Sequence, residues 1–181
     1  MAEKKFLLGY LIVETKDNYF RGAALVVDQR GIPVDFRYTE PVRPTKLERI
    51  LYGGALDIYL REEVILDNLL GAVETKPSIW LVDNEDLIDP VQKISKTMTL
   101  AIESTSHAPL DHSGTCEPSA EEGGFLFQAD NISAPLHLIV SGDGAAKIQQ
   151  TTDMLTAAAA DMEIMEPFGR ISRAFEAVLD A

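Results

Sequence analysis

The chain has 181 residues, of which 46% are apolar and 25% are charged, and its net charge at pH 7 is −13. This composition is that of an ordinary globular protein and excludes a disordered, collagenous or coiled-coil chain. A single cysteine excludes an internal disulfide, and the excess of acidic residues argues against general binding to nucleic acid or to an anionic membrane.

The first 40 residues predict a three-stranded antiparallel meander. Residues 5–15 and 20–27 are apolar at both odd and even positions, so both faces of each strand should be covered. Short segments of turn-forming residues separate the strands. Between Val34 and Tyr38 apolar and polar residues alternate, which predicts a third strand with one face in water.

A helix is predicted to follow this meander. Thr45 and Glu48 have the spacing of a capping box, in which each side chain binds a backbone N–H of the first turn. Apolar residues continue at helical spacing as far as Leu70. The pair Gly53-Gly54 interrupts the pattern, and each glycine costs about 1 kcal/mol relative to alanine inside a helix. We therefore expect the helix to break or kink at this pair.

The middle of the chain predicts a buried strand, a helix and a further strand. Residues 79–82 form a short apolar run with β-branched and aromatic members that ends at Asp83. A short helix is expected over residues 86–96, and alternation over residues 98–102 predicts the next strand. The order is therefore βββαβαβ, an α/β (α+β) arrangement in which helices pack on a mixed sheet.

Residues 105–124 differ in composition from the rest of the chain. They are rich in Ser, Thr, Pro, Gly and acidic residues, with Leu110 as the only large aliphatic residue. We therefore predict a flexible loop or linker at about 105–124, inside a single domain that spans residues 1–181. Two strands and two helices are expected after it, and His137 should lie on a sheet face.

The order of these elements resembles the start of the ribonuclease H-like fold. In that family, carboxylates from the first strand, the following helix and the end of the fourth strand converge within ~4 Å of paired metal ions that cleave phosphodiester bonds. The resemblance implies Glu48 and Asp83 as two of these carboxylates. The first strand offers no third, because residues 6–13 contain no acid and Glu14 lies at the strand's exit.

His107, Asp111, His112 and Cys116 are the candidates for a metal site, because all four are competent ligands within ten residues. Structural zinc sites more often take paired ligands from two tight turns, and this segment has no CxxC or HxxxH pair. We therefore expect a polar loop without a metal ion, and no cofactor.

A stiff connection joins the meander to the first helix. Pro41 and Pro44 fix the backbone around them, so the neighbouring side chains lose little entropy on binding. Tyr38, Glu40 and Arg43 on this connection are the predicted interaction residues.

The leading functional hypothesis is a non-catalytic interaction subunit or adaptor in the cytoplasm, which leans against an enzyme without deciding the question. Its partner would be another protein, in a hetero- or homo-oligomer. Residues 1–50 carry nine Lys and Arg against seven Asp and Glu, so an acidic partner surface can approach them. Neither a membrane nor direct nucleic-acid binding is expected. The alternatives are a metal-dependent nuclease or phosphoesterase with a ribonuclease H-like fold, and a small-ligand sensor domain.

Overall fold

The computed structural model describes residues 5–179. Its strands are β1 (Leu7–Lys16), β2 (Tyr19–Asp28), β3 (Pro33–Tyr38), β4 (Ile79–Val82), β5 (Thr99–Ser104), β6 (Cys116–Pro118), β7 (Gly124–Phe127) and β8 (Leu136–Ile139). Its helices are α1 (Lys46–Tyr52), α2 (Leu56–Tyr59), α3 (Asp67–Ala72), α4 (Ile88–Ser95), α5 (Ile148–Ala159) and α6 (Glu166–Leu179). A π-helical stretch, Leu60–Leu66, joins α2 to α3.

The eight strands form one mixed sheet in the order β3-β2-β1-β4-β5-β8-β7-β6. The β1, β2 and β3 strands pair antiparallel, whereas β1 pairs parallel with β4, and β4 pairs parallel with β5. The predicted meander and the mixed α/β class are therefore confirmed.

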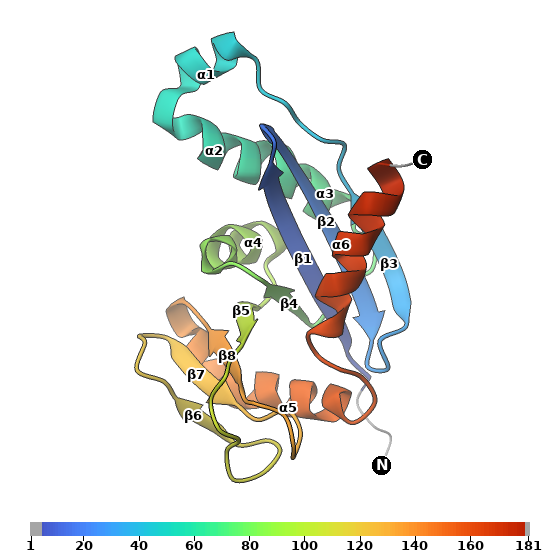
Figure 1. Ribbon diagram of the computed structural model, residues 1–181, viewed down its shortest axis with the longest axis vertical. Helices are drawn as coiled ribbons and strands as arrows, with labels where there is room; N and C mark the ends of the chain where they lie inside the picture. The colour runs from blue at the N-terminus through green and yellow to red at the C-terminus, as the bar shows by residue number, and fades with distance from the viewer. Residues whose placement is uncertain (1–4, 180–181) are drawn as a thin grey trace.

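Helices cover both faces of the sheet, which explains why residues 7–13 of β1 and 22–27 of β2 are all apolar or glycine. In β1, Leu8 and Tyr10 pack into the core beneath α5 and α6, whereas Leu11 packs into the core beneath α3 and α4. Figure 1 shows α6 lying across β1 and β2 on one side of the sheet, with α4 on the other side. The structure is thus a three-layer α/β/α arrangement, in which every residue of β1 between Leu8 and Ile12 is buried.

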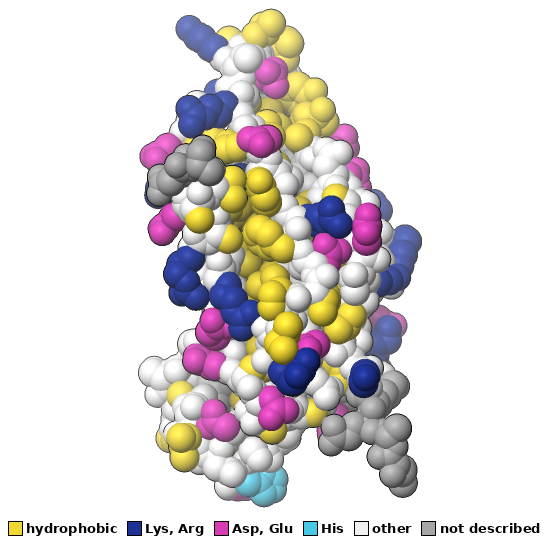
Figure 2. Space-filling view, turned by 90° about the vertical axis from the view of Figure 1, so that its right-hand side faces the viewer, with side chains coloured by type: hydrophobic (Ala, Val, Ile, Leu, Met, Phe, Trp, Pro, Cys, Tyr) yellow, Lys and Arg dark blue, Asp and Glu magenta, His cyan; other side chains and the backbone are white. Residues whose placement is uncertain are grey.

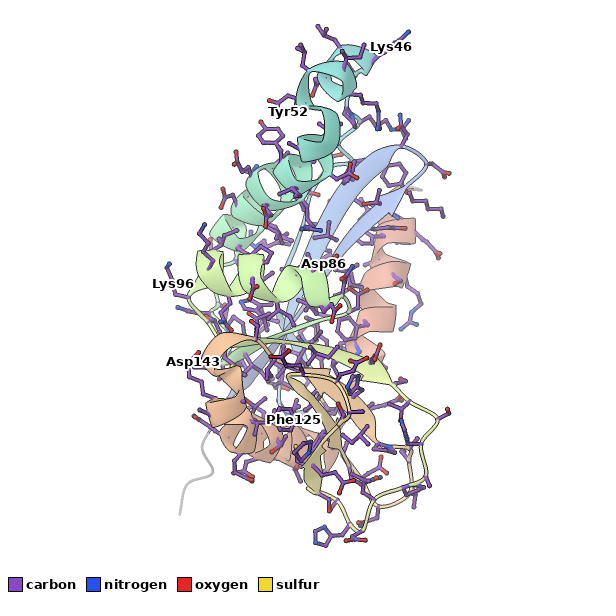
Figure 3. All side chains as sticks on the ribbon, turned by 90° about the vertical axis from the view of Figure 1, so that its left-hand side faces the viewer. Lys46, Tyr52, Asp86, Lys96, Phe125 and Asp143 are labelled. Carbon is purple, nitrogen blue, oxygen red and sulfur yellow. The ribbon has the colours of Figure 1, made fainter. Side chains whose placement is uncertain are left out.

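The helix after the meander breaks at the predicted place. Thr45 and Glu48 form both hydrogen bonds of the capping box, and α1 ends at Gly53, whose φ of 54° suits a residue without a side chain. None of the α1 residues is buried, and Leu47, Ile50 and Leu51 are each more than 60% exposed. Helix α1 therefore projects beyond the sheet, at the end of the molecule opposite Phe125 (Figure 3).

The edge strand β3 is tied to the loop that precedes β4. The Asp35 carboxylate accepts hydrogen bonds from the backbone N–H groups of Glu74 at 2.9 Å and Thr75 at 3.1 Å, and from Arg37 Nε at 2.9 Å. Burial alone would raise the pKa of Asp35, but these hydrogen bonds and the Arg37 charge lower it below the ordinary aspartate value. The ionised carboxylate therefore fastens the edge of the sheet to the loop.

Segment 105–124 contains a short strand, β6, which pairs antiparallel with β7. Beside it, the backbone N–H of Gly114 donates to the Gln128 carbonyl at 2.7 Å. The flexibility expected for this segment stays a prediction.

The outer face formed by β3 and α6 carries a band of hydrophobic side chains bordered by Lys and Arg (Figure 2). Ile32, Val34 and Tyr38 are its exposed members near the sheet edge, each between 45% and 47% exposed. Over residues 5–179, no helix is both long enough and apolar enough to cross a lipid bilayer.

Candidate active site at the ends of β1 and β4

Asp83 leaves the sheet at the carboxyl end of β4, beside β1. The parallel register places Leu11 opposite Val82, so the chain reaches Asp83 where β1 continues into Ile12. The Asp83 side chain is exposed, yet desolvation by the surrounding protein raises the pKa of its carboxyl group above the ordinary value. A hydrogen bond from its own backbone N–H opposes this rise and is the weaker effect. Ligand sites in open α/β sheets lie outside the carboxyl ends of the strands, which is the position of Asp83.

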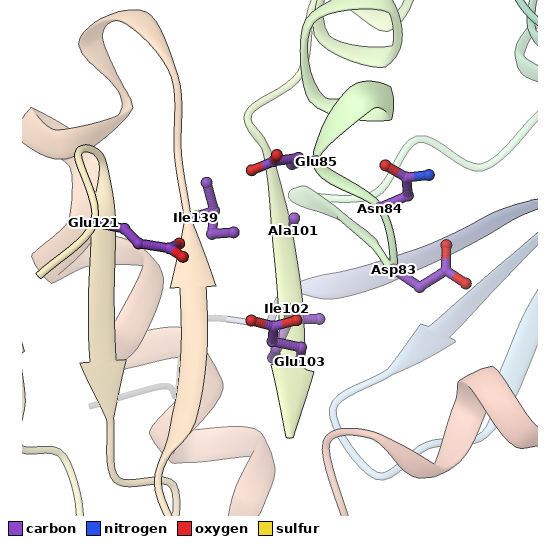
Figure 4. Close-up of a pocket in the computed structure, with 8 residues that line it drawn as sticks. All are labelled: Asp83, Asn84, Glu85, Ala101, Ile102, Glu103, Glu121 and Ile139. Atoms are coloured by element: carbon purple, nitrogen blue, oxygen red, sulfur yellow. The ribbon is translucent and has the colours of Figure 1, made fainter. Parts of the chain in front are cut away.

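Asp83 lines two hollows. The first, of about 320 Å³, lies towards β5 and β8, and its other charged residues are Glu85, Glu103 and Glu121. Figure 4 shows these three glutamates around the hollow, with Asp83 turned away from them. Because every charged residue of this hollow is acidic, it repels phosphate groups and favours neutral or cationic molecules.

The second hollow, of about 360 Å³, lies between the end of β1 and α6. Besides Asp83, its charged lining residues are Glu14, Lys16, Arg21 and Glu176. Lys16 and Arg21 are the only basic residues that line either hollow. This hollow therefore carries two basic residues beside three acidic ones, Glu14, Asp83 and Glu176.

Arg21 is the most deeply buried charge of the site. Its side chain is 6% exposed, and its Nε donates to Glu14 Oε2 at 2.7 Å. The guanidinium lies 4.2 Å from the centre of the Phe175 ring in α6, and its Nη1 is 3.5 Å from the Phe175 carbonyl oxygen. The pair therefore neutralises Glu14, the acid at the exit of β1, and joins β1, β2 and α6.

Glu48 does not meet Asp83, contrary to what the ribonuclease H-like resemblance implies. The Glu48 carboxylate lies 3.0 Å from Thr45 Oγ1 within the capping box. Helix α1 points away from the sheet after the stiff connection, and the Lys46–Tyr52 segment lies well apart from Asp86 (Figure 3). Glu48 therefore has a structural role at the start of α1.

The donors present do not fit the paired divalent ions of ribonuclease H-like nucleases. In the part of the chain that the structure describes, no three His, Cys, Asp or Glu side chains are grouped as a metal ion requires. Near Asp83, Glu14 is held by Arg21.

The four candidate ligands of the 105–124 segment are likewise not brought together. His112 Nδ1 lies 2.7 Å from Thr115 Oγ1, and Cys116 lies half-buried in β6. Burial and the nearby Glu117 carboxylate raise the pKa of the Cys116 thiol, which disfavours the thiolate that binds metals.

The three predicted interaction residues lie near the sheet edge and on the connection. Tyr38 and Glu40 are exposed, and the guanidinium of Arg43 lies 5.5 Å from the centre of the Tyr19 ring. The connection is anchored to β2, because the backbones of Val42 and Phe20 exchange two hydrogen bonds of 2.8 Å. These three residues line neither of the hollows at Asp83.

Sequence reasoning missed the role of Arg21. A signal was present, because Arg21 is the one charged residue between Tyr19 and Val27, where the chain is otherwise apolar or small. A charge at a buried position is kept when it is paired.

The fold is that of the ribonuclease H-like proteins, an α/β class with a mixed sheet covered by helices. Two solved structures that share it with this chain are Endonuclease V from Bacillus subtilis and human Endonuclease V. The first is 13% identical and has a TM-score of 0.56, over 95% of this chain and 81% of that one. The second is 14% identical with a TM-score of 0.55, over 98% of this chain and 87% of the human chain. No protein-family model and no curated protein matches the sequence.

This comparison corrects two sequence-based predictions. The non-catalytic adaptor is wrong, because the two solved structures that share the fold over 95% and 98% of this chain are endonucleases, which favours the nuclease alternative. The expectation of no direct nucleic-acid binding is wrong on the same finding. Both predictions relied on the net charge of −13, which is a sum over the whole chain. A binding site depends instead on local charges, such as that of Lys16 in the hollow at Asp83.

Proposed function

We propose that this protein is a nuclease, and that it cleaves phosphodiester bonds at Asp83. The observation that carries the proposal is the position of Asp83, at the carboxyl end of β4 beside β1, on a fold shared with two endonucleases. This is the place where the ribonuclease H-like resemblance expects a reacting carboxylate. Lys16 in the adjoining hollow supports an anionic substrate.

The chemistry assigned to Asp83 is proton transfer. Desolvation raises its pKa, which makes the carboxylate a better proton acceptor for an attacking water molecule. Lys16 would face the negative charge that develops on the phosphate oxygens, whereas Arg21 is held by Glu14 and Phe175. A divalent ion would supply a Lewis acid and an activated water, but the described donors do not fit one, so proton transfer is assigned to Asp83 alone.

The test is cleavage of labelled single- and double-stranded DNA and RNA, in Mg²⁺, in Mn²⁺ and in EDTA. We expect cleavage by the wild type and a loss of about 100-fold or more in Asp83→Asn, the usual size of a general-base contribution. Asp86→Asn is the matched control, because Asp86 is exposed, close in sequence and outside both hollows. Glu48→Gln should cleave at the wild-type rate. Wild-type protein that leaves every substrate intact, or Asp83→Asn with full activity, would refute the proposal.

A further inference from the structure

His137, on β8, has hydrogen-bond partners on both ring nitrogens. Nδ1 lies 2.8 Å from Glu103 Oε1, and Nε2 lies 3.2 Å from Ser119 Oγ. The side chain of His137 is only 9% exposed. Strand register produces the first contact, since β5 and β8 pair antiparallel with Glu103 directly opposite His137. The turn between β6 and β7 brings Ser119 to the other side of the ring.

Gly124 makes room for this arrangement. A Cβ atom at position 124 would lie 2.3 Å from Ser119 Oγ and 2.8 Å from His137 Nε2, so any other residue would push the two apart. The backbone also holds Ser119, because its N–H donates to the Gly124 carbonyl at 2.9 Å. The serine and the imidazole are therefore fixed against each other by the fold.

A second carboxylate and a backbone donor complete the surroundings. Glu121 Oε2 lies 3.7 Å from His137 Nε2, and the Glu121 backbone N–H donates to Ser119 Oγ at 3.3 Å. Glu103 and Glu121, the two carboxylates beside the ring, also line the first hollow, and Ser119 is half-buried, so a small molecule can reach the serine from solvent beside that hollow.

We propose that Ser119, His137 and Glu103 form a nucleophile, a base and an orienting acid, and that they hydrolyse small esters at the first hollow. Such a set is recognised by its geometry and by the role of each member, whatever the fold or the chain order. In this arrangement His137 Nδ1 carries the proton and donates a hydrogen bond to Glu103. Nε2 is then unprotonated and can accept the Ser119 proton. The site shares no reacting residue with the phosphodiester cleavage proposed at Asp83.

The reaction proceeds in two steps, acylation of Ser119 and hydrolysis of the acyl-serine. Ser119 Oγ gives its proton to His137 Nε2 and bonds to the ester carbonyl carbon, and the carbon–oxygen bond to the alcohol then breaks as Nε2 returns the proton to the leaving oxygen. A water molecule next attacks the acyl-serine, with its proton again taken by Nε2. When the acid leaves, that proton returns to Ser119 Oγ. The net change is ester plus water to acid plus alcohol.

The acidic lining selects the substrate. Glu85, Glu103 and Glu121 repel anionic esters, so neutral or cationic acyl esters are the substrate class. A phosphodiester or an acidic thioester should therefore be a poor substrate here.

The first test uses an uncharged fluorophosphonate, which bonds to an activated serine with loss of fluoride, followed by intact mass measurement. We expect one adduct per wild-type chain and none in Ser119→Ala. His137→Gln should slow labelling about 100-fold, the scale of general-base catalysis. Ser106→Ala is the matched control, since Ser106 is exposed in the same segment, and it should label fully.

Peptide mapping of the wild-type adduct decides the site independently of how any variant folds. An adduct on Ser119 supports the proposal, whereas an unlabelled wild-type chain or an adduct on another residue overturns it. Asp83→Asn should label at the wild-type rate, so failure of the nuclease proposal and failure of this one are distinguishable. Hydrolysis of p-nitrophenyl acetate, lost in Ser119→Ala and reduced in Glu103→Gln, should follow the labelling.

Discussion

Replacing Glu14 by glutamine removes one partner of the most deeply buried ion pair of the site. The Arg21 guanidinium would stay 6% exposed with no carboxylate at its Nε, although the Phe175 ring still covers it. Breaking a buried pair from one side costs about 3–5 kcal/mol, and we expect about 3 kcal/mol here because Glu14 itself is partly open to water. The free energy of unfolding should fall by that amount in Glu14→Gln.

The assay is urea denaturation followed by the fluorescence of Trp80, the one tryptophan, which is 2% exposed. The double variant Glu14→Gln with Arg21→Met removes both partners and should recover to within about 1 kcal/mol of the wild type, because no unpaired charge remains. Glu40→Gln, on the exposed connection, is the control and should change stability by less than about 0.5 kcal/mol. A double variant less stable than Glu14→Gln would show that the pair is not the source of the effect.

Two further predictions concern the fold. Asp35→Ala should be less stable than the wild type at pH 7, and the difference should shrink below about pH 4 in urea titrations. The reason is that a carboxylate with a lowered folded pKa stabilises the protein above its unfolded pKa of about 3.9, and this contribution is lost as pH falls through the folded pKa. Gly9→Ala should cost about 1–3 kcal/mol by overpacking, since its Cβ would lie 2.5 Å from Trp80 Cε3. A Cβ at position 54 would have no atom within 4 Å. Gly54→Ala should therefore raise the thermal midpoint, because alanine lowers the conformational entropy of the unfolded chain. Equal thermal midpoints for Gly9→Ala and Gly54→Ala would contradict the packing argument.

The elements of the fold could be predicted because local patterns determine them. Apolar residues at both parities of β1 and β2 indicate strands covered on both sides, and Thr45 with Glu48 marks a helix start. The π-helical stretch Leu60–Leu66 could not be predicted, since its seven residues follow the same apolar spacing as an α-helix.

The site was harder to predict because it depends on which distant strands lie side by side. The position of Asp83 could be predicted, since a carboxylate directly after a buried strand is a local signal, and its role in catalysis stays a proposal. Glu48 was misplaced, because the direction of α1 follows from the tethered connection rather than from its own sequence. The meeting of Ser119 with His137 spans 18 residues and depends on the register of three strands, and no spacing rule reports that register.

Proline lies at both outer strands of the sheet, in β3 at Pro33 and in β6 at Pro118. A proline has no N–H to donate, so each edge strand lacks a donor at one end, β3 at its first residue and β6 at its last. Strand addition, by which many sheets capture extended peptides or join into fibrils, is therefore hindered at both ends. The protein should accordingly stay free of amyloid-type association at high concentration.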